Sequence, residues 1–288
     1  MVVLVTGANG QLGQSLQFVA NQYSEIDFVF CSSSELEITN FTNCESIFLK
    51  YQPDFCINAA AYTAVDKAES EQEKAASVNA SGAQNLAEVC KTHNTILLHV
   101  STDFVFDGNA TKPILENEIP NPTSIYGLTK LRGEQIIQAT WEKHFIIRTS
   151  WVYSQFGANF MKTMLRLSSE KDSLSVVNDQ IGTPTYAVDL ANALIKIIDS
   201  CHAEFISASN YGIYNFSNEG QCSWYEFAKE IFAQKNITID LKPIPSSQFP
   251  TPAKRPAYSV LDKSKIKATF DIAINDWKTS LANCLDNY

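Results

Sequence analysis

The first 150 residues alternate between short β-branched stretches and segments of helix length, and no other sequence feature restricts the fold as strongly. The predicted strands are Val2–Thr6, Asp27–Cys31, Asp54–Asn58, Thr95–Ser101 and His144–Ser150. The predicted helices between them are Gln11–Gln22, Asn43–Tyr51, Glu71–His93 and Ser124–Lys143. Strands that alternate with helices indicate parallel pairing, because a parallel pair needs a long crossover connection. We therefore expect an α/β fold with a doubly wound, Rossmann-type parallel sheet.

Beyond residue 150 the alternation becomes less regular. Helices are expected over Asn159–Ser169, Val188–Ile198 and Ser223–Gln234, and strands over Leu174–Asn178 and Gly212–Phe216. Five prolines between Lys242 and Ala257 argue against a helix interior or a central strand there. We expect residues 1–150 to form the sheet domain and residues 151–288 a smaller α/β lobe, some segments of which could return to the sheet. The loop near residues 200–211 is expected to be the most mobile part of the surface.

Composition mainly excludes classes of function. The 288 residues suffice for a core that needs no disulfide or structural metal. The net charge of −9 disfavours nucleic acid or an anionic membrane as the main partner. Seven scattered cysteines without a C-x-x-C pair suggest neither a disulfide framework nor a zinc site. With no apolar run of membrane-spanning length and no basic segment before the first strand, we expect a soluble cytoplasmic protein.

A glycine-rich turn follows the first predicted strand. It consists of Gly7-Ala8-Asn9-Gly10-Gln11-Leu12-Gly13 and leads into the first predicted helix. Glycine permits a tight turn, lets a pyrophosphate approach the backbone and lets helix and strand pack closely, while the helix N-terminus offers free N–H groups to an anion. We expect this turn to bind a dinucleotide, which would make residues 1–150 an NAD(P)-binding domain. The alternative is a tight turn with a structural role only.

The second predicted strand ends without an acid. It closes with Phe30 and Cys31 and is followed by Ser32-Ser33-Ser34, whereas an acid at this place normally binds the ribose 2′-hydroxyl of NAD. Without a carboxylate to repel a 2′-phosphate, we expect NADPH to be preferred and NADH to be usable. Ser32 is the candidate contact to the cofactor at this position.

Tyr126 and Lys130 form the candidate proton-transfer pair. They stand four residues apart, which places them on one face of the predicted helix. A nearby ammonium should lower the pKa of the phenol and make it a usable acid. Thr102 ends the fourth predicted strand, where open α/β sheets bind ligands. We expect Thr102 to orient a substrate carbonyl, Tyr126 to donate a proton, and Lys130 to tune the tyrosine and hold the nicotinamide ribose.

Several stretches together resemble a known family. They are the glycine turn, N-A-A-A-Y-T-A-V-D-K-A-E at Asn58–Glu69, S-T-D-F-V-F-D-G at Ser101–Gly108, Y-G-L-T-K at Tyr126–Lys130, R-T-S-W-V-Y at Arg148–Tyr153, V-N-D-Q-I-G-T-P-T at Val177–Thr185 and T-P-A-K-R-P-A-Y-S-V-L at Thr251–Leu261. This set is similar to the extended short-chain dehydrogenase/reductase superfamily, and within it to the dTDP-4-dehydrorhamnose reductase family. The resemblance covers nearly the whole chain.

The resemblance implies an activity. Members of that family reduce the 4-keto group of dTDP-4-dehydro-β-L-rhamnose to dTDP-β-L-rhamnose with NADPH or NADH. It further implies a place in the biosynthesis of dTDP-rhamnose, a nucleotide sugar used for carbohydrates such as the O-antigen of lipopolysaccharide. The expected partner of this chain is then a dTDP-sugar, bound by the smaller lobe.

The resemblance also implies roles for single residues. The residues matching the family's catalytic triad are Thr102, Tyr126 and Lys130. Those matching its cofactor site, besides Gly7 and Gly13 of the turn, are Gly10, Gln11 and Leu12 at the pyrophosphate, Glu37 and Ile38 at the adenine, and Ala61, Tyr62 and Thr63 beneath the cofactor. Those matching its substrate site are Asp103 and Trp151 at the sugar and Arg255 beside the nucleotide.

Two positions depart from the family pattern. Some dimeric relatives bind magnesium at the subunit interface through acids, one of them in the first helix, and Ser15 stands there in this chain. The acid that ends the second strand in some relatives is Cys31 here. Mg²⁺ is an option within the family, but we expect no metal site in this chain, which should be a monomer or a weak homodimer.

Other interpretations remain open at this point. A non-catalytic regulatory subunit of the same fold, like the β subunit of methionine adenosyltransferase, would need no acid catalyst. A reductase or epimerase of another dTDP-keto-sugar would keep much of the same site. His99 lies in an apolar strand and is expected to be a core residue without chemistry, and Asn178, Asp179 and Gln180 could order the pocket or cap a turn.

Overall fold

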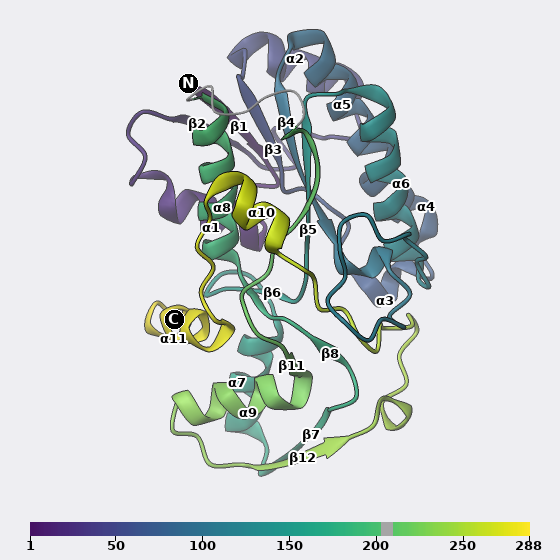
Figure 1. Ribbon diagram of the computed structural model, residues 1–288, viewed down its shortest axis with the longest axis vertical. Coiled ribbons are helices and arrows are strands. Elements are labelled where there is room, and N and C mark those ends of the chain that lie inside the picture. Colours follow the sequence, from purple (N-terminus) through teal and green to yellow (C-terminus); the bar gives the residue numbers. More distant parts are fainter. Residues whose placement is uncertain (203–209) are drawn as a thin grey trace.

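The central feature of the fold is a parallel sheet. The computed structural model describes residues 1–202 and 210–288, and within them six strands form one sheet in the order β10-β5-β4-β3-β1-β2 (Figure 1). The strands are β1 (Val2–Thr6), β2 (Asp27–Cys31), β3 (Phe55–Asn58), β4 (Ile96–Thr102), β5 (His144–Thr149) and β10 (Gly212–Asn215). All adjacent pairs are parallel. The predicted doubly wound parallel sheet is confirmed, and each strand predicted in the first half ends within one residue of its expected bounds.

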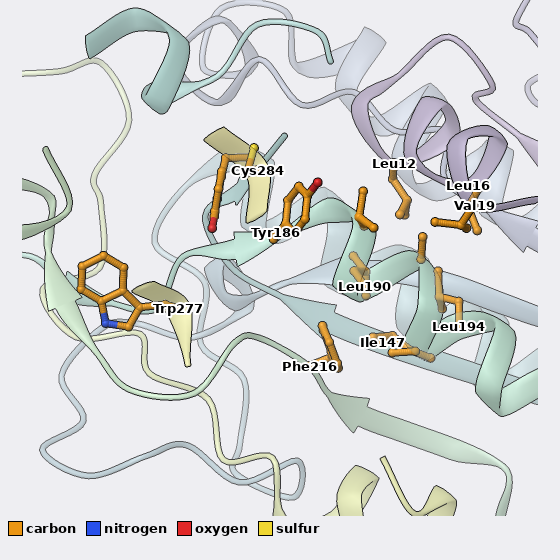
Figure 2. Packing of buried hydrophobic residues seen from close by; sticks show 14 of the residues in the cluster. Leu12, Leu16, Val19, Ile147, Tyr186, Leu190, Leu194, Phe216, Trp277 and Cys284 are labelled. Carbon is orange, nitrogen blue, oxygen red and sulfur yellow. The ribbon is translucent and has the colours of Figure 1, made fainter. Parts of the chain in front are cut away.

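Helices cover both faces of the sheet (Figure 1). One face carries α1 (Gln11–Ala20), α8 (Ala187–His202) and α10 (Ser264–Phe270), and the other carries α2 (Phe41–Tyr51), α5 (Gly82–His93) and α6 (Ile125–Thr140). Successive side chains of a strand point to opposite faces. Accordingly Val3 and Val5 pack in the core under α1 and α8, whereas Leu4 packs in the core under α2 and α5. Figure 2 shows the first of these cores, where Leu16 and Val19 of α1 lie near Leu194 of α8.

The remaining elements form the smaller part of the molecule, seen in the lower half of Figure 1. It contains α7 (Phe160–Glu170), α9 (Trp224–Gln234) and α11 (Trp277–Asp286), and three short strand pairs. The pairs are β6 (Val152–Tyr153) with β9 (Thr185–Tyr186), β7 (Ser173–Val177) with β12 (Asp240–Ile244), and β8 (Ile181–Gly182) with β11 (Cys222–Ser223). No helix of the described residues is long and apolar enough to cross a membrane.

One prediction for the second half needs correction. The helix predicted to end at Ile198 continues to His202, so the first residues of the predicted mobile loop at 200–211 are helical. The remainder of that loop, residues 203–209, lies outside the described residues. Pro243 lies within β12, which pairs only with β7 among the described residues, so it is not in a central strand, in agreement with the prediction, and its missing N–H can face away from the pairing partner.

The helix predicted over Glu71–His93 runs without a break from Gln72 to His93, but it is not α-helical throughout. It consists of α4 (Gln72–Ala76), a π-helical turn over Ser77–Ser81 and α5, and it follows the short α3 (Val65–Ala68). The wider turn carries Asn79, whose side chain accepts from the backbone N–H of Tyr62 at 2.9 Å and donates to Thr129 Oγ1 of α6 at 3.1 Å. These hydrogen bonds attach the loop after β3 to α6. Single π-turns inside α-helices are frequent at functional sites.

A buried ion pair joins α6 to the sheet. Glu134 of α6 accepts from Arg148 of β5, with an Nη2–Oε2 distance of 2.6 Å and an Nε–Oε1 distance of 3.0 Å, and neither side chain is more than 2% exposed. Ser101 of β4 donates its hydroxyl to the same carboxylate. The three residues therefore hold α6 at one position over β4 and β5.

We predict that Glu134→Ala lowers the free energy of unfolding by about 3–5 kcal/mol, because Arg148 would keep a buried charge without its counter-charge. Urea denaturation measures this change. The matched control is Glu170→Ala, which breaks the exposed pair of Glu170 with Arg166 and should change stability by only about 0.3–0.5 kcal/mol. Equal effects of the two substitutions would contradict the structural role of Glu134.

Candidate active site

A cleft of about 630 Å³ lies where β1, β3, β4 and β5 end. Its walls come from the glycine turn, the loops after these strands, the start of α6 and residues of the smaller part. The predicted site residues that line it are Gly10, Gln11, Leu12, Ala61, Thr63, Thr102, Asp103, Tyr126, Lys130, Trp151 and Arg255. The predicted site residues that do not line it are Gly7, Gly13, Ser32, Glu37, Ile38 and Tyr62.

The glycine turn brings α1 against β1 at a distance that a side chain would prevent. A Cβ on Gly13 would lie 2.3 Å from the carbonyl oxygen of Gly7, and Gly7 itself has a φ of +68°. Gly10 stands at the N-cap of α1 without any side chain to occupy the first N–H groups of the helix. These features fit the pyrophosphate of a dinucleotide, which needs close backbone approach and free N–H donors.

Gln11 links the turn to the smaller part of the molecule. Its Oε1 accepts from Asn159 Nδ2 at 2.9 Å and from Ser154 Oγ at 3.3 Å. Both partners follow β6, so one side chain connects the glycine turn with the loop after β6, and Gln11 and Asn159 both border the cleft. Nothing in the sequence pattern singled out these two residues.

A carboxylate lies at the end of β2, although no acid stands in the strand's last residues. Glu35 folds back so that its Oε2 accepts from the backbone N–H of Ser32 at 2.8 Å and from its hydroxyl at 2.7 Å. These hydrogen bonds lower the pKa of Glu35. Nearby, Ile38 packs beneath Gly82, where a Cβ would lie 2.7 Å from its Cδ1. A carboxylate from the loop that follows β2 therefore lies beside the end of the strand.

Thr102 and Tyr126 meet at the floor of the cleft. Thr102 ends β4 and donates its hydroxyl to Asp103 Oδ1 at 3.0 Å, Tyr126 lies in the first turn of α6, and both side chains border the cleft. Ser124 caps α6 by accepting from the backbone N–H of Gly127 at 3.2 Å, which fixes where the helix begins. The ring of Phe104 meets the Tyr126 ring edge to face at 5.5 Å. Two groups able to bind one carbonyl oxygen therefore stand side by side.

The expected effect of Lys130 on Tyr126 is wrong for this structure. Burial raises the pKa of Tyr126 to about 12, with the charge of Asp103 adding to the rise and the neighbouring Thr102 hydroxyl opposing it. Lys130 is directed elsewhere: its Nζ donates to the carbonyl oxygen of Val100 at 2.7 Å and lies 3.3 Å from His99 Nε2. Burial lowers the pKa of Lys130 to about 8. Loss of water around the Tyr126 phenol therefore changes its pKa more than the attraction to the Lys130 ammonium that the four-residue spacing suggested.

Trp151 has a strained backbone and a packed ring. Its φ is +45°, which is unusual for a bulky residue. Its indole stacks on Trp224 with ring centroids 3.6 Å apart, and a Cβ on Gly182 would come within 2.6 Å of the indole. The ring is held from two sides and still borders the cleft. Trp224, which the sequence analysis did not single out, belongs to the same wall.

Arg255 is paired with a carboxylate. Its Nη1 and Nη2 donate to the two oxygens of Asp66 at 3.0 and 2.7 Å. Arg255 borders both the cleft and a second, apolar pocket of about 430 Å³ that lies between α7, β7 and Phe249. The pair closes one side of the cleft, and Asp66 is a further residue that the sequence analysis missed.

The described residues contain no group of three or more His, Cys, Asp or Glu side chains that could hold a metal ion. Ser15, which stands where some relatives carry an acid, is fully buried and donates its hydroxyl to the carbonyl oxygen of Gln11 at 2.9 Å.

Asp103 is the basis of a pH-dependent prediction. Burial raises the pKa of Asp103 to about 6, against the hydrogen bond that its Oδ1 accepts from Thr102, while an unfolded aspartate titrates near pH ~4. The folded protein therefore binds a proton more tightly in this window, and its stability falls as the pH rises from about 4 to about 6. Asp103→Asn removes this dependence. Relative to the original chain, the variant should gain about 1–3 kcal/mol between these pH values in urea denaturation.

Asp107→Asn is the matched control for this experiment. The pKa of Asp107 is lowered, chiefly by the hydrogen bond from the backbone of Asn109. Its removal should therefore change the pH dependence in the opposite direction. A stability difference between Asp103→Asn and the original chain that does not vary with pH would refute the prediction.

Comparison with known proteins places the chain among sequences of the same length. The family model described as RmlD substrate binding domain matches residues 1–288. A curated dTDP-4-dehydrorhamnose reductase from Aggregatibacter actinomycetemcomitans is 44% identical over 98% of this chain and 97% of its own length.

Solved structures agree with this match. A dTDP-4-dehydrorhamnose reductase from Clostridium acetobutylicum superposes with a TM-score of 0.93 at 42% identity, covering 100% of this chain and 99% of its own. One from Bacillus anthracis, crystallised in complex with NADP, superposes with a TM-score of 0.94 at 38% identity and the same coverage.

Proposed function

The chain belongs to the family that the RmlD substrate binding domain defines, and we propose that it reduces the 4-keto group of dTDP-4-dehydro-β-L-rhamnose to dTDP-β-L-rhamnose. The observation that supports this most strongly is that Thr102 and Tyr126 line the same cleft as Gly10, Gln11 and Leu12 of the glycine turn. A carbonyl reductase needs those two features side by side.

In the proposed reaction a bound nicotinamide cofactor supplies the hydride, and the protein supplies placement and a proton. The N–H groups at the start of α1 hold the pyrophosphate, and Thr102 orients the carbonyl by a hydrogen bond. With its pKa raised to about 12, Tyr126 is protonated at neutral pH and can donate to the carbonyl oxygen. Lys130 lies beneath this site and completes the triad.

The smaller part of the molecule is proposed to bind the sugar nucleotide. We assign the sheet domain to residues 1–150 and the substrate lobe mainly to residues 151–288. Trp151 and Trp224 provide an apolar wall next to Tyr126, and Asp103 provides a polar group for the sugar. The apolar pocket beside α7 can accept the base, while Arg255 stands between it and the cleft, where a diphosphate would pass.

The cofactor preference is proposed to be NADPH with NADH also used. The related Bacillus anthracis reductase in complex with NADP supports this, and the serines after β2 offer hydroxyl groups to a phosphate. Glu35 limits the preference, because its carboxylate lies against Ser32. We further propose a cytoplasmic location for a monomer or weak homodimer that works without Mg²⁺.

Tyr126→Phe should lose most turnover, by about 10²–10⁴-fold in kcat, because the proton donor is removed. The measurement is NADPH consumption with dTDP-4-dehydrorhamnose, generated in place from dTDP-glucose by a dehydratase and an epimerase. Cofactor binding, followed by nicotinamide fluorescence, should be retained. A kcat near that of the original chain would defeat the mechanism. No turnover by the folded, cofactor-bound original chain with either nicotinamide would favour another keto-sugar or a regulatory subunit.

Glu35→Gln should raise kcat/KM for NADPH by about tenfold and change that for NADH less, because a carboxylate near a 2′-phosphate costs on the order of 1 kcal/mol or more. Steady-state kinetics with both cofactors test this. Glu25→Gln, at the opposite end of β2, is the control and should leave the ratio unchanged. An unchanged ratio in Glu35→Gln would remove Glu35 from the cofactor site.

A further inference from the structure

A row of polar side chains crosses the sheet beneath α6. The strand register pairs Thr6 with Asn58 and Asn58 with His99. All three side chains are at most 2% exposed. They lie on the same face as Leu4, Cys56 and Leu97, which belong to the core under α2 and α5. Buried polar groups in such a place need partners, and these three find them in one another.

The direction of each hydrogen bond in this row follows from one backbone group. The N–H of Ala60 can only donate, and it lies 3.2 Å from Asn58 Oδ1, which also accepts from Thr6 Oγ1 at 2.7 Å. The other amide atom of Asn58, Nδ2, can only donate, and it lies 2.9 Å from His99 Nδ1. His99 therefore accepts at Nδ1, and its neutral ring carries the proton on Nε2.

That proton faces Lys130. The distance from His99 Nε2 to Lys130 Nζ is 3.3 Å, and Nζ donates to the carbonyl oxygen of Val100 at 2.7 Å. An ammonium group has no lone pair and would set its hydrogen against that of His99, whereas a neutral amine can accept from His99 while donating to Val100. The geometry thus fits the amine form of Lys130.

The charges around the pair agree with this assignment. Burial holds the pKa of His99 well below its ordinary value, with Lys130 and His144 adding to the effect. Glu134, one turn along α6, raises the pKa of Lys130, but its carboxylate is taken up by Arg148 and Ser101. Asp103 and Tyr126 face the cleft on the other side. Across residues 1–202 and 210–288, no carboxylate lies within ion-pair distance of Lys130 Nζ.

We propose that His99 is a positioning residue for Lys130: the sheet fixes the imidazole proton on Nε2, and this N–H holds the lysine beside Val100 as a neutral amine. Lys130 then gains and loses a proton in the pH range in which the enzyme works, instead of remaining a permanent cation. The proposal deepens the proposed function and rests on it for the role of Lys130 beside Tyr126.

The first test reads the tautomer directly. Two-bond ¹H–¹⁵N correlation spectra of the four histidines should show His99, assigned by its loss in His99→Gln, as the neutral form with its proton on Nε2 between about pH 6 and 9. His144 is an internal reference, because its Nδ1 lies 2.5 Å from the carbonyl oxygen of Trp141 and must donate. A His99 proton on Nδ1, or a charged ring at neutral pH, would overturn the proposal.

The second test uses Asn58→Asp to reverse the direction of the hydrogen bond between residue 58 and His99. A carboxylate there accepts from His99 Nδ1–H and leaves the Nε2 lone pair facing Lys130. Lys130 then donates to Nε2 as well as to Val100, and the ammonium form makes this contact more strongly than the amine. With ¹³Cε-labelled lysine, the titration of Lys130 should move up by about one pH unit or more, and the basic limb of kcat/KM should follow it. Thr6→Val keeps the Ala60 contact to Asn58 and should move neither.

The double variant Asn58→Asp, His99→Phe separates the ring from the added charge. If the carboxylate acts through the imidazole, most of the shift in Lys130 titration disappears in this variant; if the full shift remains, His99 is not the connection and the proposal fails. Both spectroscopic tests work without substrate. Absence of reductase activity in the original chain would therefore refute the proposed function while leaving the assignment of His99 and Lys130 decided by the spectra.

Discussion

The attachment of α6 to β4 and β5 is the contact on which the candidate active site depends. Thr102 comes from β4, whereas Tyr126 and Lys130 come from α6, so their groups meet only if the helix lies at one height along the strands. Apolar packing is not directional enough to set that height alone. The buried carboxylate of Glu134 does fix the height of the helix. It must meet both Arg148 and Ser101, because otherwise a buried charge would be left unpaired.

The first half of the fold was predictable because local and global signals agree there. Each strand of the sheet up to His144–Thr149 is a β-branched or apolar stretch bounded by turn residues, and the glycine turn marks where β1 passes into α1. The second half was less predictable. Two-residue strands such as β8 and β11 exist only through their partners, and the π-turn at Asn79 depends on contacts with Tyr62 and Thr129, both distant in sequence.

In the candidate site, too, some features were predictable from local sequence and others were not. The positions proposed to be catalytic and the glycine turn were identified from motifs, and the cleft is lined by Thr102, Tyr126, Lys130 and the middle residues of the turn, Gly10 to Leu12. The carboxylate of Glu35 was missed, since it reaches Ser32 only after the chain turns back on itself. The pKa of Tyr126 was predicted in the wrong direction, because spacing on a helix reports proximity but not burial. His99 was assigned to the core correctly as regards burial, yet its contact with Lys130 requires the register of three strands.

The return of β10 to the edge of the sheet, with α8 packed along α1, has a consequence for how the chain is made. A ribosome releases the protein from its N-terminus, so β1 to β5 emerge well before the strand and helix that complete their sheet and cover one of its faces. Until α8 has left the exit tunnel, the apolar side chains of β1 and β5 that it will cover remain open to water, and the edge of β5 stays unpaired until β10 follows. The nascent sheet is therefore exposed to association with other chains during that interval.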